Sequence, residues 1–496
     1  MSALLAAVIL APLTASAVGL ALGKNQPLRD ASTMLGLAGA TAASFGLLYQ
    51  VANNGTVVLR VGDWDPELGI VLVADTFAVL VLPVALSIIL VVEIFAIGQR
   101  RNAWGANPEI SGPLIGVLAT GVALSMLTGD LFTLFVAFEL ILVSSYVLLT
   151  HQGKRDQVQS GMTYVSMNLF ASTLFLFGIA FVYASTGTVN MALLAERIPE
   201  LSNGVRLGIG AWFFIVFGTK AAVFPLFSWL PDSYPTAPTT ITAVFAGLLT
   251  KIGVYSMIRF HTLTGMDQLG SIFLIIAGLT MIIGAIGALA QSDVKRILSF
   301  HIISQIGYML MGIGLFSAAG TAGAILFLVH HMPVKTVLFL VGGLLENETG
   351  TSRLSKVGGL AKSKPLIAGL FAVPALSLAG LPPFSGFVAK FGVISAGIEE
   401  ASTAIVIVAL IAGVLTLTSM VKIWMGVFWG EPTEHQMNNP TPTTTGANRT
   451  TMLAATSLAV TGTLVISLFA GTLFDLSIEA ADDLRARTPY IEAVQQ

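Results

Sequence analysis

The chain has 496 residues, of which 55% are hydrophobic and only 10% are charged, and its formal net charge is −2. A soluble domain with so few charged residues would lack the polar surface that it needs in water, so a soluble globular protein is excluded. The small negative charge argues against a nucleic-acid partner. Cysteine is absent from the sequence, which excludes disulfides and thiolate metal or iron–sulfur sites in this chain.

Apolar runs long enough to cross a bilayer, about 20 residues each, recur along the whole sequence. The first, residues 1–22, lacks the basic start and the cleavage site of a signal peptide, so we expect it to be a membrane helix. The predicted fold class is an all-α polytopic membrane protein with about fourteen transmembrane helices. Their centres lie near Leu13, Ala40, Leu86, Leu118, Leu140, Phe175, Phe217, Leu249, Ile282, Gly307, Ala324, Ala379, Val414 and Leu464.

Basic residues in the connecting loops predict the orientation. If the N-terminus lies outside, the internal loops carry most of the lysines and arginines, as membrane proteins usually require. The external segments then hold only Arg60, Arg197, Arg206, Arg259, Arg485 and Arg487. Because the predicted number of spans is even, both termini are predicted to lie outside.

Four lysines and one glutamate fall inside apolar spans: Lys220, Lys251, Lys335, Lys390 and Glu139. A charge near the bilayer centre costs about 3 kcal/mol or more, which a passive scaffold has no reason to carry. Burial moves the pKa of a lysine side chain towards neutral, and a nearby carboxylate opposes this shift. We therefore predict that Lys220 pairs with Glu139 as a switchable proton site. The alternative is a static buried ion pair that only fixes helix packing.

Helix-breaking residues lie next to two of these lysines. Lys220 is followed by Pro225, Pro231, Pro235 and Pro238, and Lys390 follows the sequence Gly380-Leu-Pro-Pro. Proline removes a backbone donor, and the carbonyls that it frees inside a membrane must find another partner. Broken helices beside a charged residue are typical of ion transporters. A purely structural proline kink is the alternative.

A third polar segment, His330-His331-Met-Pro-Val-Lys335, lies between the two breaks. His331 and Lys335 are four residues apart and share a helical face. An imidazole can relay a proton at neutral pH, so both histidines are candidate site residues. The preceding span carries two further polar pairs, Ser304 with Tyr308 and His301 with Gln305. Either pair is a candidate lining for a wet path, unless its members simply bond to backbone. Neither a Walker A sequence nor a metal-binding histidine spacing is present, so no cofactor and no metal are predicted.

The segment Pro225-Leu-Phe-Ser-Trp-Leu-Pro-Asp232, followed by Leu248-Leu-Thr-Lys-Ile-Gly253, resembles the signature of the antiporter-like proton-pumping membrane proteins. Asp293-Val-Lys-Arg-Ile-Leu-Ser299 and the Gly380-Leu-Pro-Pro segment follow in the same order. This superfamily contains the N, M and L subunits of respiratory complex I and the large subunits of Mrp multisubunit antiporters. The pattern is most similar to the D-type subunits of Mrp antiporters, because position 390 is lysine and no long C-terminal extension follows the last span.

The resemblance implies a fold of two five-helix repeats in inverted orientation. Residues 1–112 would form helices one to three, 113–262 the first repeat, 263–430 the second repeat, and 431–496 a cytoplasmic loop, the last helix and an external tail. The resemblance also implies a central hydrophilic axis that contains Glu139, Lys220, Lys251, His330, Lys335 and Lys390.

The implied function is proton translocation within a multisubunit antiporter that exchanges Na⁺ or K⁺ for protons across a bacterial cytoplasmic membrane. The expected partners are the A, B, C, E, F and G subunits of the antiporter and membrane lipid, with no nucleic acid. The chain is expected to be a transporter subunit and not an enzyme. The alternative is an N-like proton-pumping subunit of an NADH:quinone oxidoreductase. A passive scaffold is disfavoured by the four buried lysines.

Overall fold

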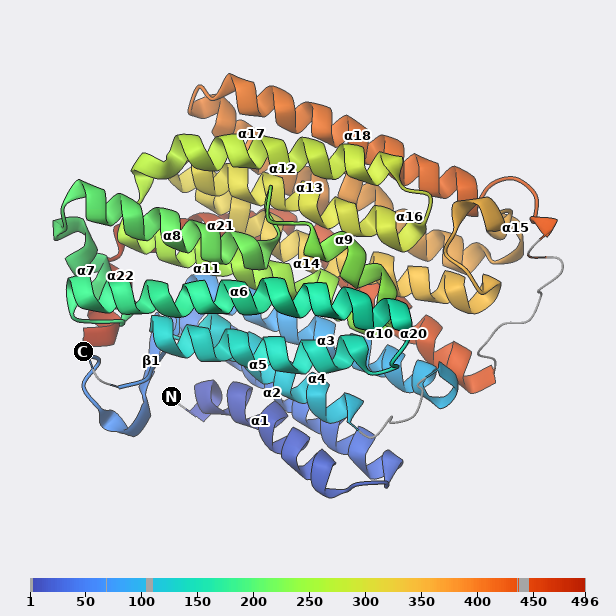
Figure 1. Ribbon diagram of the computed structural model, residues 1–496, viewed down its shortest axis with the longest axis horizontal. Coiled ribbons are helices and arrows are strands. Elements are labelled where there is room, and N and C mark those ends of the chain that lie inside the picture. Colours follow the sequence, from blue (N-terminus) through green and yellow to red (C-terminus); the bar gives the residue numbers. More distant parts are fainter. Residues whose placement is uncertain (1–2, 68, 104–109, 435, 437–445, 496) are drawn as a thin grey trace.

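The computed structural model describes residues 3–67, 69–103, 110–434, 436 and 446–495. Long helices lie side by side in one bundle, and both termini lie at the same end of it (Figure 1). In this part of the chain, twelve helices are long and apolar enough to span a membrane, and Ser111–Leu127 and Pro365–Ala379 are shorter apolar helices. The predicted class of polytopic all-α membrane protein is confirmed, whereas the total of fourteen spans stays a prediction.

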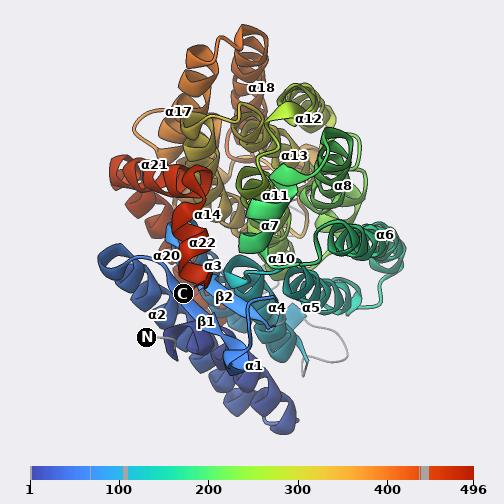
Figure 2. The same cartoon turned by 90° about the vertical axis from the view of Figure 1, so that its left-hand side faces the viewer.

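The N-terminal part consists of three long helices and a small hairpin. The helices are α1 (Ala3–Ala21), α2 (Gln26–Asn54) and α3 (Thr76–Ala103). A hairpin connects α2 to α3, in which β1 (Val57–Arg60) pairs antiparallel with β2 (Val71–Ala74) and Val57 lies opposite Ala74. The short η1 (Val61–Asp63) follows β1. Figure 2 looks onto the end of the bundle where this hairpin lies.

The middle of the chain forms two successive sets of helices. The first set is α4 (Ser111–Leu127), α5 (Leu131–Thr150), α6 (Arg155–Thr186), α7 (Met191–Arg197), η2 (Ile198–Glu200), α8 (Asn203–Ala221), α9 (Trp229–Ser233), η3 (Tyr234–Thr236), α10 (Thr239–Val244), the π-helix η4 (Phe245–Leu249) and α11 (Thr250–Thr264). The second set is η5 (Asp267–Leu269), α12 (Gly270–Ala290), α13 (Val294–Gly314), α14 (Ala318–Thr349), η6 (Leu354–Lys356), α15 (Leu360–Ser363), α16 (Pro365–Ala379), α17 (Ser385–Glu399) and α18 (Thr403–Val427).

The two sets share the same local structure at α5 and α13. Asp130 caps α5 and Asp293 caps α13, because each side chain accepts a hydrogen bond from a backbone N–H of the first turn. The helices that follow, α6 and α14, both have 32 residues and end at a left-handed glycine. Asp130 then bridges to Asn190, and Asp293 bridges to Arg353. Each of these features in the second set lies 163 residues after its counterpart. The repeat limits at 113–262 and 263–430 and the inverted orientation remain predictions.

Two spans occupy the centre of the bundle. Every residue in the most apolar stretch of α14, and of the span Thr239–Thr264, is buried inside the protein. Helices that are apolar on all sides pack in the interior, away from the surrounding solvent or lipid. Polar groups on these two spans therefore face protein and not lipid, which is the environment that a buried lysine needs.

The segment predicted as a tail is helical, and its external position stays a prediction. After α20 (Gly446–Leu468), the chain continues as α21 (Ala470–Ala486) and α22 (Thr488–Gln495). Helix α21 packs on α14, and α22 packs on α7 and β1 at the end of the bundle seen in Figure 2. Residues 437–445 of the predicted cytoplasmic loop lie outside the described residues. The segment predicted as a tail is thus an integral part of the packed bundle.

The prediction that Arg259 lies in an external loop is wrong. It lies within α11 and is 4% exposed. Its guanidinium pairs with Asp75 at the start of α3 and donates a hydrogen bond to the Tyr255 hydroxyl at 2.9 Å. The ring of Tyr490, on α22, lies 5.2 Å from the same guanidinium. Hydropathy alone predicted that the span ends before Arg259. The helix continues because the buried Arg259 guanidinium is paired with the Asp75 carboxylate.

Gly386 in the first turn of α17 allows this helix to pack closely on the end of α16. A Cβ at this position would lie 1.8 Å from the Ser377 carbonyl oxygen, whereas a Cβ at Gly369 on α16 would meet nothing within 4 Å. We expect Gly386→Ala to lower stability by about 1–3 kcal/mol, because backbone must shift to accept the methyl group. Thermal unfolding of the purified assembly measures this.

Gly369→Ala is the matched control, and we expect it to leave the unfolding temperature unchanged or slightly raised, since alanine favours a helix. Equal unfolding temperatures for the Gly386→Ala variant and the native protein would contradict the close packing of α16 and α17.

Candidate functional site

The four predicted lysines lie on four different helices and are all buried. Lys220 ends α8, Lys251 lies on α11, Lys335 on α14 and Lys390 on α17. None of them forms an ion pair with an acidic residue in the described part of the chain. A buried ammonium without a counterion needs other oxygen acceptors. Each lysine finds these acceptors at a neighbouring helix or at an irregular helical turn.

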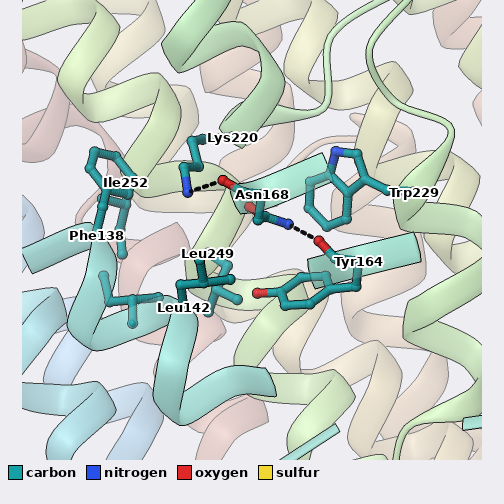
Figure 3. A pocket seen from close by; sticks show the side chains of 9 residues that line it. Phe138, Leu142, Tyr164, Asn168, Lys220, Trp229, Leu249 and Ile252 are labelled. Atoms are coloured by element: carbon teal, nitrogen blue, oxygen red, sulfur yellow. Dashed lines mark hydrogen bonds between the residues drawn. The ribbon is translucent and has the colours of Figure 1, made fainter. Parts of the chain in front are cut away.

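Lys220 lies where α8 stops. The helix ends at Ala221, because Ala222 adopts a left-handed conformation with φ 60°. The ammonium of Lys220 donates to the Asn168 carbonyl at 3.3 Å (Figure 3). It also donates to Ser172 Oγ at 3.1 Å, and both acceptors belong to α6. The ammonium lies 5.4 Å from the centre of the Phe138 ring. The negative end of the α8 dipole favours a cation at this position.

Glu139 does not form the expected ion pair with Lys220. No contact within 4.0 Å joins the two groups, although the carboxylate is close enough to act on the ammonium electrostatically. One carboxylate oxygen of Glu139 is buried and has no hydrogen-bond partner among the described residues. The direct pairing is therefore wrong for this structure, because Ser172 and Asn168 provide nearer acceptors. The influence of Glu139 on Lys220 is thus electrostatic and not a direct contact.

A polar stripe runs along α6 to Lys220. The stripe consists of side chains three or four residues apart: Gln157, Ser160, Tyr164, Asn168 and Ser172. The Tyr164 hydroxyl lies 2.7 Å from Ser145 Oγ, and Asn168 Nδ2 donates to the Tyr164 carbonyl at 2.9 Å. A small cavity of about 20 Å³ lies beside Lys220, lined by Tyr164, Asn168 and Trp229 among others (Figure 3). It has room for water next to polar partners.

The opposite side of Lys220 is closed by aromatic rings. They are Phe135, Phe138, Phe175, Phe213, Phe217 and Phe260, from α5, α6, α8 and α11. Phe138 and Phe175 have ring centres 5.9 Å apart, and Phe213 and Phe260 are 4.4 Å apart. Polar contacts from Lys220 thus continue towards the Arg155 end of α6 but not towards its Thr186 end. Polar side chains therefore lie on one side of Lys220 and aromatic rings on the other.

Lys251 and Lys335 bind backbone carbonyls at the centre of the bundle. Lys251 follows the π-helix η4 closely, and its ammonium donates to the Ala246 carbonyl of that π-helix. The wider π turn changes the backbone pairing, and such turns often occur at functional sites. Lys335 donates to the Leu298 carbonyl of α13 at 3.2 Å. The charges of Lys251 and Lys335 act on each other across the packed helices.

Lys390 lies beside the break between α16 and α17. Its ammonium donates to the carbonyl of Ala379, the last residue of α16, at 3.1 Å and lies 5.0 Å from the Tyr308 ring centre. The C-terminal end of α16 presents unpaired carbonyls, which attract a cation. On α14, His330 Nδ1 lies 2.9 Å from Ser385 Oγ at the start of α17. The break therefore brings Lys390 and His330 to the same junction.

His331 on α14 lies among the lysines Lys251, Lys335 and Lys390. The charges of Lys251, Lys335 and Lys390 all act on its ring, and neither ring nitrogen has a hydrogen-bond partner among the described residues. His301 Nδ1 and Gln305 Oε1 are also buried without partners in this part of the chain. Buried polar atoms of this kind are usually satisfied by ordered water. A hydrated path past His331 is what this arrangement permits.

The two predicted polar pairs of α13 take different roles. His301 Nε2 contacts Ser419 Oγ at 2.6 Å, and Gln305 Nε2 donates to Thr416 Oγ1 at 3.4 Å, so both reach α18. The other pair, Ser304 and Tyr308, donates instead to the Met281 and Ala409 carbonyls of neighbouring helices. The first pair keeps unpaired polar atoms that can face water, whereas the hydroxyls of the second pair are occupied by backbone.

Several contact residues were not identified from the sequence. The 3–4 spacing of polar residues along α6 was a usable signal for Asn168 and Ser172. No sequence signal marked the Ala246 or Leu298 carbonyls, because any residue supplies a carbonyl. The described residues contain no group of three or more histidine, aspartate or glutamate side chains that is placed to hold a metal ion.

Buried lysines beside broken helices in a bundle of membrane spans define the class of antiporter-like membrane proteins. Residues 128–416 match the family described as NADH:quinone oxidoreductase/Mrp antiporter, TM. The chain is 41% identical over 492 residues to the D subunit of the Na(+)/H(+) antiporter of Alkalihalophilus pseudofirmus, and 37% identical over 495 residues to that of Bacillus subtilis. Each alignment covers 98% of both chains. The chain belongs to this family, in its group of antiporter D subunits.

Two solved structures have the same fold. A chain of the Mrp complex from Dietzia sp. DQ12-45-1b is 33% identical and superposes with a TM-score of 0.91, covering 100% of both chains. A chain of the archaeal membrane-bound sulfane sulfur reductase is 25% identical, with a TM-score of 0.89 over 99% of both chains. One fold thus occurs in two kinds of membrane complex.

Lys251 offers a direct test of whether a buried lysine contributes to stability. Its side chain is fully buried and has one carbonyl partner among the described residues. We expect Lys251→Met to raise the stability of the purified assembly by about 1–4 kcal/mol, because an isosteric apolar side chain avoids the cost of burying an ammonium. Thermal unfolding measures the change.

Lys362→Met is the control, since that side chain is 81% exposed and its ion pair with Glu431 contributes little. A Lys251→Met assembly that unfolds at a lower temperature than the native one would show that Lys251 is a structural charge.

Proposed function

We propose that this chain is the proton-translocating component of a multisubunit antiporter that exchanges a monovalent cation, Na⁺ or K⁺, for protons. The observation that carries the proposal is the set of four buried lysines without acidic partners among the described residues, two beside helix breaks and two on central spans. The cost of burying these charges is explained if the lysines gain and lose protons. The names of the relatives, which are D subunits of Na(+)/H(+) antiporters, and the likeness to a chain of an Mrp complex support the same function.

In the proposed path, the first step is exchange between water and Lys220. The polar stripe of α6 and the cavity beside Asn168 bring water from one side of the membrane, and the phenylalanine cluster blocks the other side. Glu139 holds a carboxylate near the ammonium and favours its charged form. When the carboxylate turns away, Lys220 has only neutral acceptors and releases its proton more readily.

The second step passes the proton through the group around His331. An ammonium at Lys251 repels charge at Lys335, and Lys335 and Lys390 repel each other in the same way. Protonation of one lysine therefore favours proton loss from the next. His331 lies within electrostatic reach of all three lysines, and its unpaired ring nitrogens suit a relay through water. Lys390 is the terminal site, next to the carbonyl end of α16.

The chain works as one component of an assembly. Its partners are the other subunits of a multisubunit antiporter, and it is a transport subunit and not the redox catalyst of an oxidoreductase. It is a multi-pass protein of the bacterial cytoplasmic membrane, with both termini proposed to face outwards. An NADH-driven pump would instead move protons without added Na⁺ or K⁺, so the cation dependence of proton flux separates the two functions.

The carboxylate of Glu139 gives the first functional test. In membrane vesicles that contain the whole complex, we expect Glu139→Ala to lower Na⁺- or K⁺-dependent proton flux at least about tenfold, because Lys220 loses the negative charge that favours its protonated form. Glu139→Asp keeps the carboxylate but shortens the side chain by one methylene group, so we expect an intermediate flux. Fluorescence quenching by an acridine dye reports the pH gradient.

Complex abundance in the same membranes, measured by immunoblot, is the control for assembly. Full flux in the Glu139→Ala complex at native abundance would contradict the proposed switch between Glu139 and Lys220. Cation-independent flux in the native complex would contradict the antiport function itself.

Substitutions of Lys390 separate a proton site from a structural charge. We expect Lys390→Ala to abolish flux and Lys390→Arg to fail equally, since a guanidinium with a pKa above about 12 does not release its proton. We expect Lys390→Glu to keep part of the flux, because a buried carboxylic acid exchanges protons near neutral pH. The same vesicle assay ranks the variants.

A structural lysine predicts the reverse order, in which arginine preserves the positive charge and is tolerated best. Near-native flux in the Lys390→Arg complex would therefore exclude Lys390 as the terminal proton site.

A further inference from the structure

A second charged cavity lies at the edge of the membrane-spanning region, away from the lysines of the proposed path. It has a volume of about 310 Å³ and lies between the start of α16 and the first turns of α20. Its lining consists of Ser363, Lys364, Pro365, Leu366, Ile367, Arg449 and Leu453. The cavity thus combines two basic side chains with aliphatic ones, and no acidic residue is among the described residues that line it.

The two basic side chains are held by one buried carboxylate. Lys364 Nζ lies 2.8 Å from one oxygen of Glu348, and Arg449 Nε lies 2.5 Å from the other. The Glu348 side chain is only 2% exposed, while Lys364 and Arg449 are 34% and 30% exposed. Two cations share one anion, so one positive charge remains in excess at the cavity.

Lys364 and Arg449 have hydrogen-bond donors beyond those that contact Glu348. Among the described residues, the bond to Glu348 is the one polar side-chain contact of Arg449, and it engages Nε. No described residue forms a hydrogen bond with the terminal nitrogens of the guanidinium, and their planar fork suits phosphate oxygens. The first turn of α16, which begins at Pro365, adds the positive end of a helix dipole.

The position of the cavity matches the depth of lipid headgroups. Lys364 precedes the apolar helix Pro365–Ala379, and Arg449 lies in the first turn of the apolar span Asn448–Leu468. Both charges therefore lie at the same boundary, at the end of the bundle that carries α15 (Figure 1). Leu366, which is 56% exposed, extends from this boundary along the apolar surface of α16.

We propose that this cavity binds one anionic phospholipid, whose phosphate contacts Lys364 and Arg449 and whose acyl chains lie along Leu366 and Leu453. Basic pockets between membrane helices near the headgroup level are suited to anionic lipids. The excess positive charge selects an anionic headgroup over a zwitterionic one. The aliphatic lining favours a lipid over a soluble anion or an acidic side chain of another subunit. The proposal depends on the membrane placement of α16 and α20 and not on the transport function.

The test places a competing carboxylate in the cavity without removing either basic residue. Ser363→Glu leaves the contacts of Glu348 intact, and the new charge lies near Lys364 and the start of α16. We expect this variant to unfold at the same or a higher temperature than the native complex, because an acidic group favours a helix N-terminus. We expect it to bind phosphatidylglycerol about tenfold more weakly or worse, since the phosphate loses charge-assisted hydrogen bonds.

The measurement uses the whole purified complex after delipidation. Native mass spectrometry counts the phosphatidylglycerol that each complex retains, and thermal unfolding is recorded with phosphatidylglycerol, phosphatidylcholine or inorganic phosphate. Two matched variants serve as controls: Ser363→Gln changes size without charge, and Lys362→Gln makes the same change in net charge outside the cavity. We expect both controls to retain one more phosphatidylglycerol than Ser363→Glu and to be stabilised by that lipid alone.

Equal retention by the Ser363→Glu and Ser363→Gln complexes would overturn the proposal. Stabilisation by inorganic phosphate equal to that by phosphatidylglycerol would assign the cavity to a soluble anion instead. Equal stabilisation by phosphatidylcholine would show that the cavity does not select an anionic headgroup, which also contradicts the proposal. None of these readouts requires transport, so they are independent of the proton-flux experiments.

Discussion

The cost of placing an ammonium group inside a membrane is the constraint on which this structure depends. Each of the four lysines meets it in the same way, by donating to a backbone carbonyl and not to a carboxylate. The carbonyls come from α6, from the π-helix η4, from α13 and from the end of α16. A carbonyl stabilises the ammonium less than a carboxylate does, so the charged and neutral forms of the lysine stay closer in free energy. Such a group exchanges its proton more easily than one held in a tight ion pair.

A helix end and an irregular turn supply two of these acceptors, the carbonyls of Ala379 and Ala246. An unbroken α-helix uses its carbonyls internally and offers few to a neighbouring ammonium. The end of α16, at Ala379, faces Lys390, and α8 ends directly after Lys220. The break at the end of α16 therefore has a chemical role, because the carbonyl that it leaves unpaired within its helix accepts a hydrogen bond from Lys390. The same relation explains why close backbone packing at Gly386 lies next to a charged site.

Polar and apolar surfaces around the lysines determine the direction of access. On α6 the stripe from Gln157 to Ser172 gives way to Phe175, and the aromatic cluster closes the bundle beyond it. In the second set, unpaired atoms of His301, Gln305 and His331 mark the most polar part of the interior. Lys364 and Arg449 line a separate cavity at the start of α16, away from the buried lysines. The proposed proton path and the proposed lipid site thus lie on separate parts of the bundle.

The sequence by itself determined the membrane class and the buried lysines, because hydropathy and the cost of charge act locally along the chain. It also placed both helix breaks, since proline and glycine act within one turn. Only the tertiary structure decided which groups meet. It replaced the Glu139–Lys220 ion pair with Asn168 and Ser172, buried Arg259 against Asp75, and turned the predicted tail into packed helices. These contacts join segments far apart in the sequence, and backbone carbonyls, which serve as the main acceptors, have no signature in residue identity.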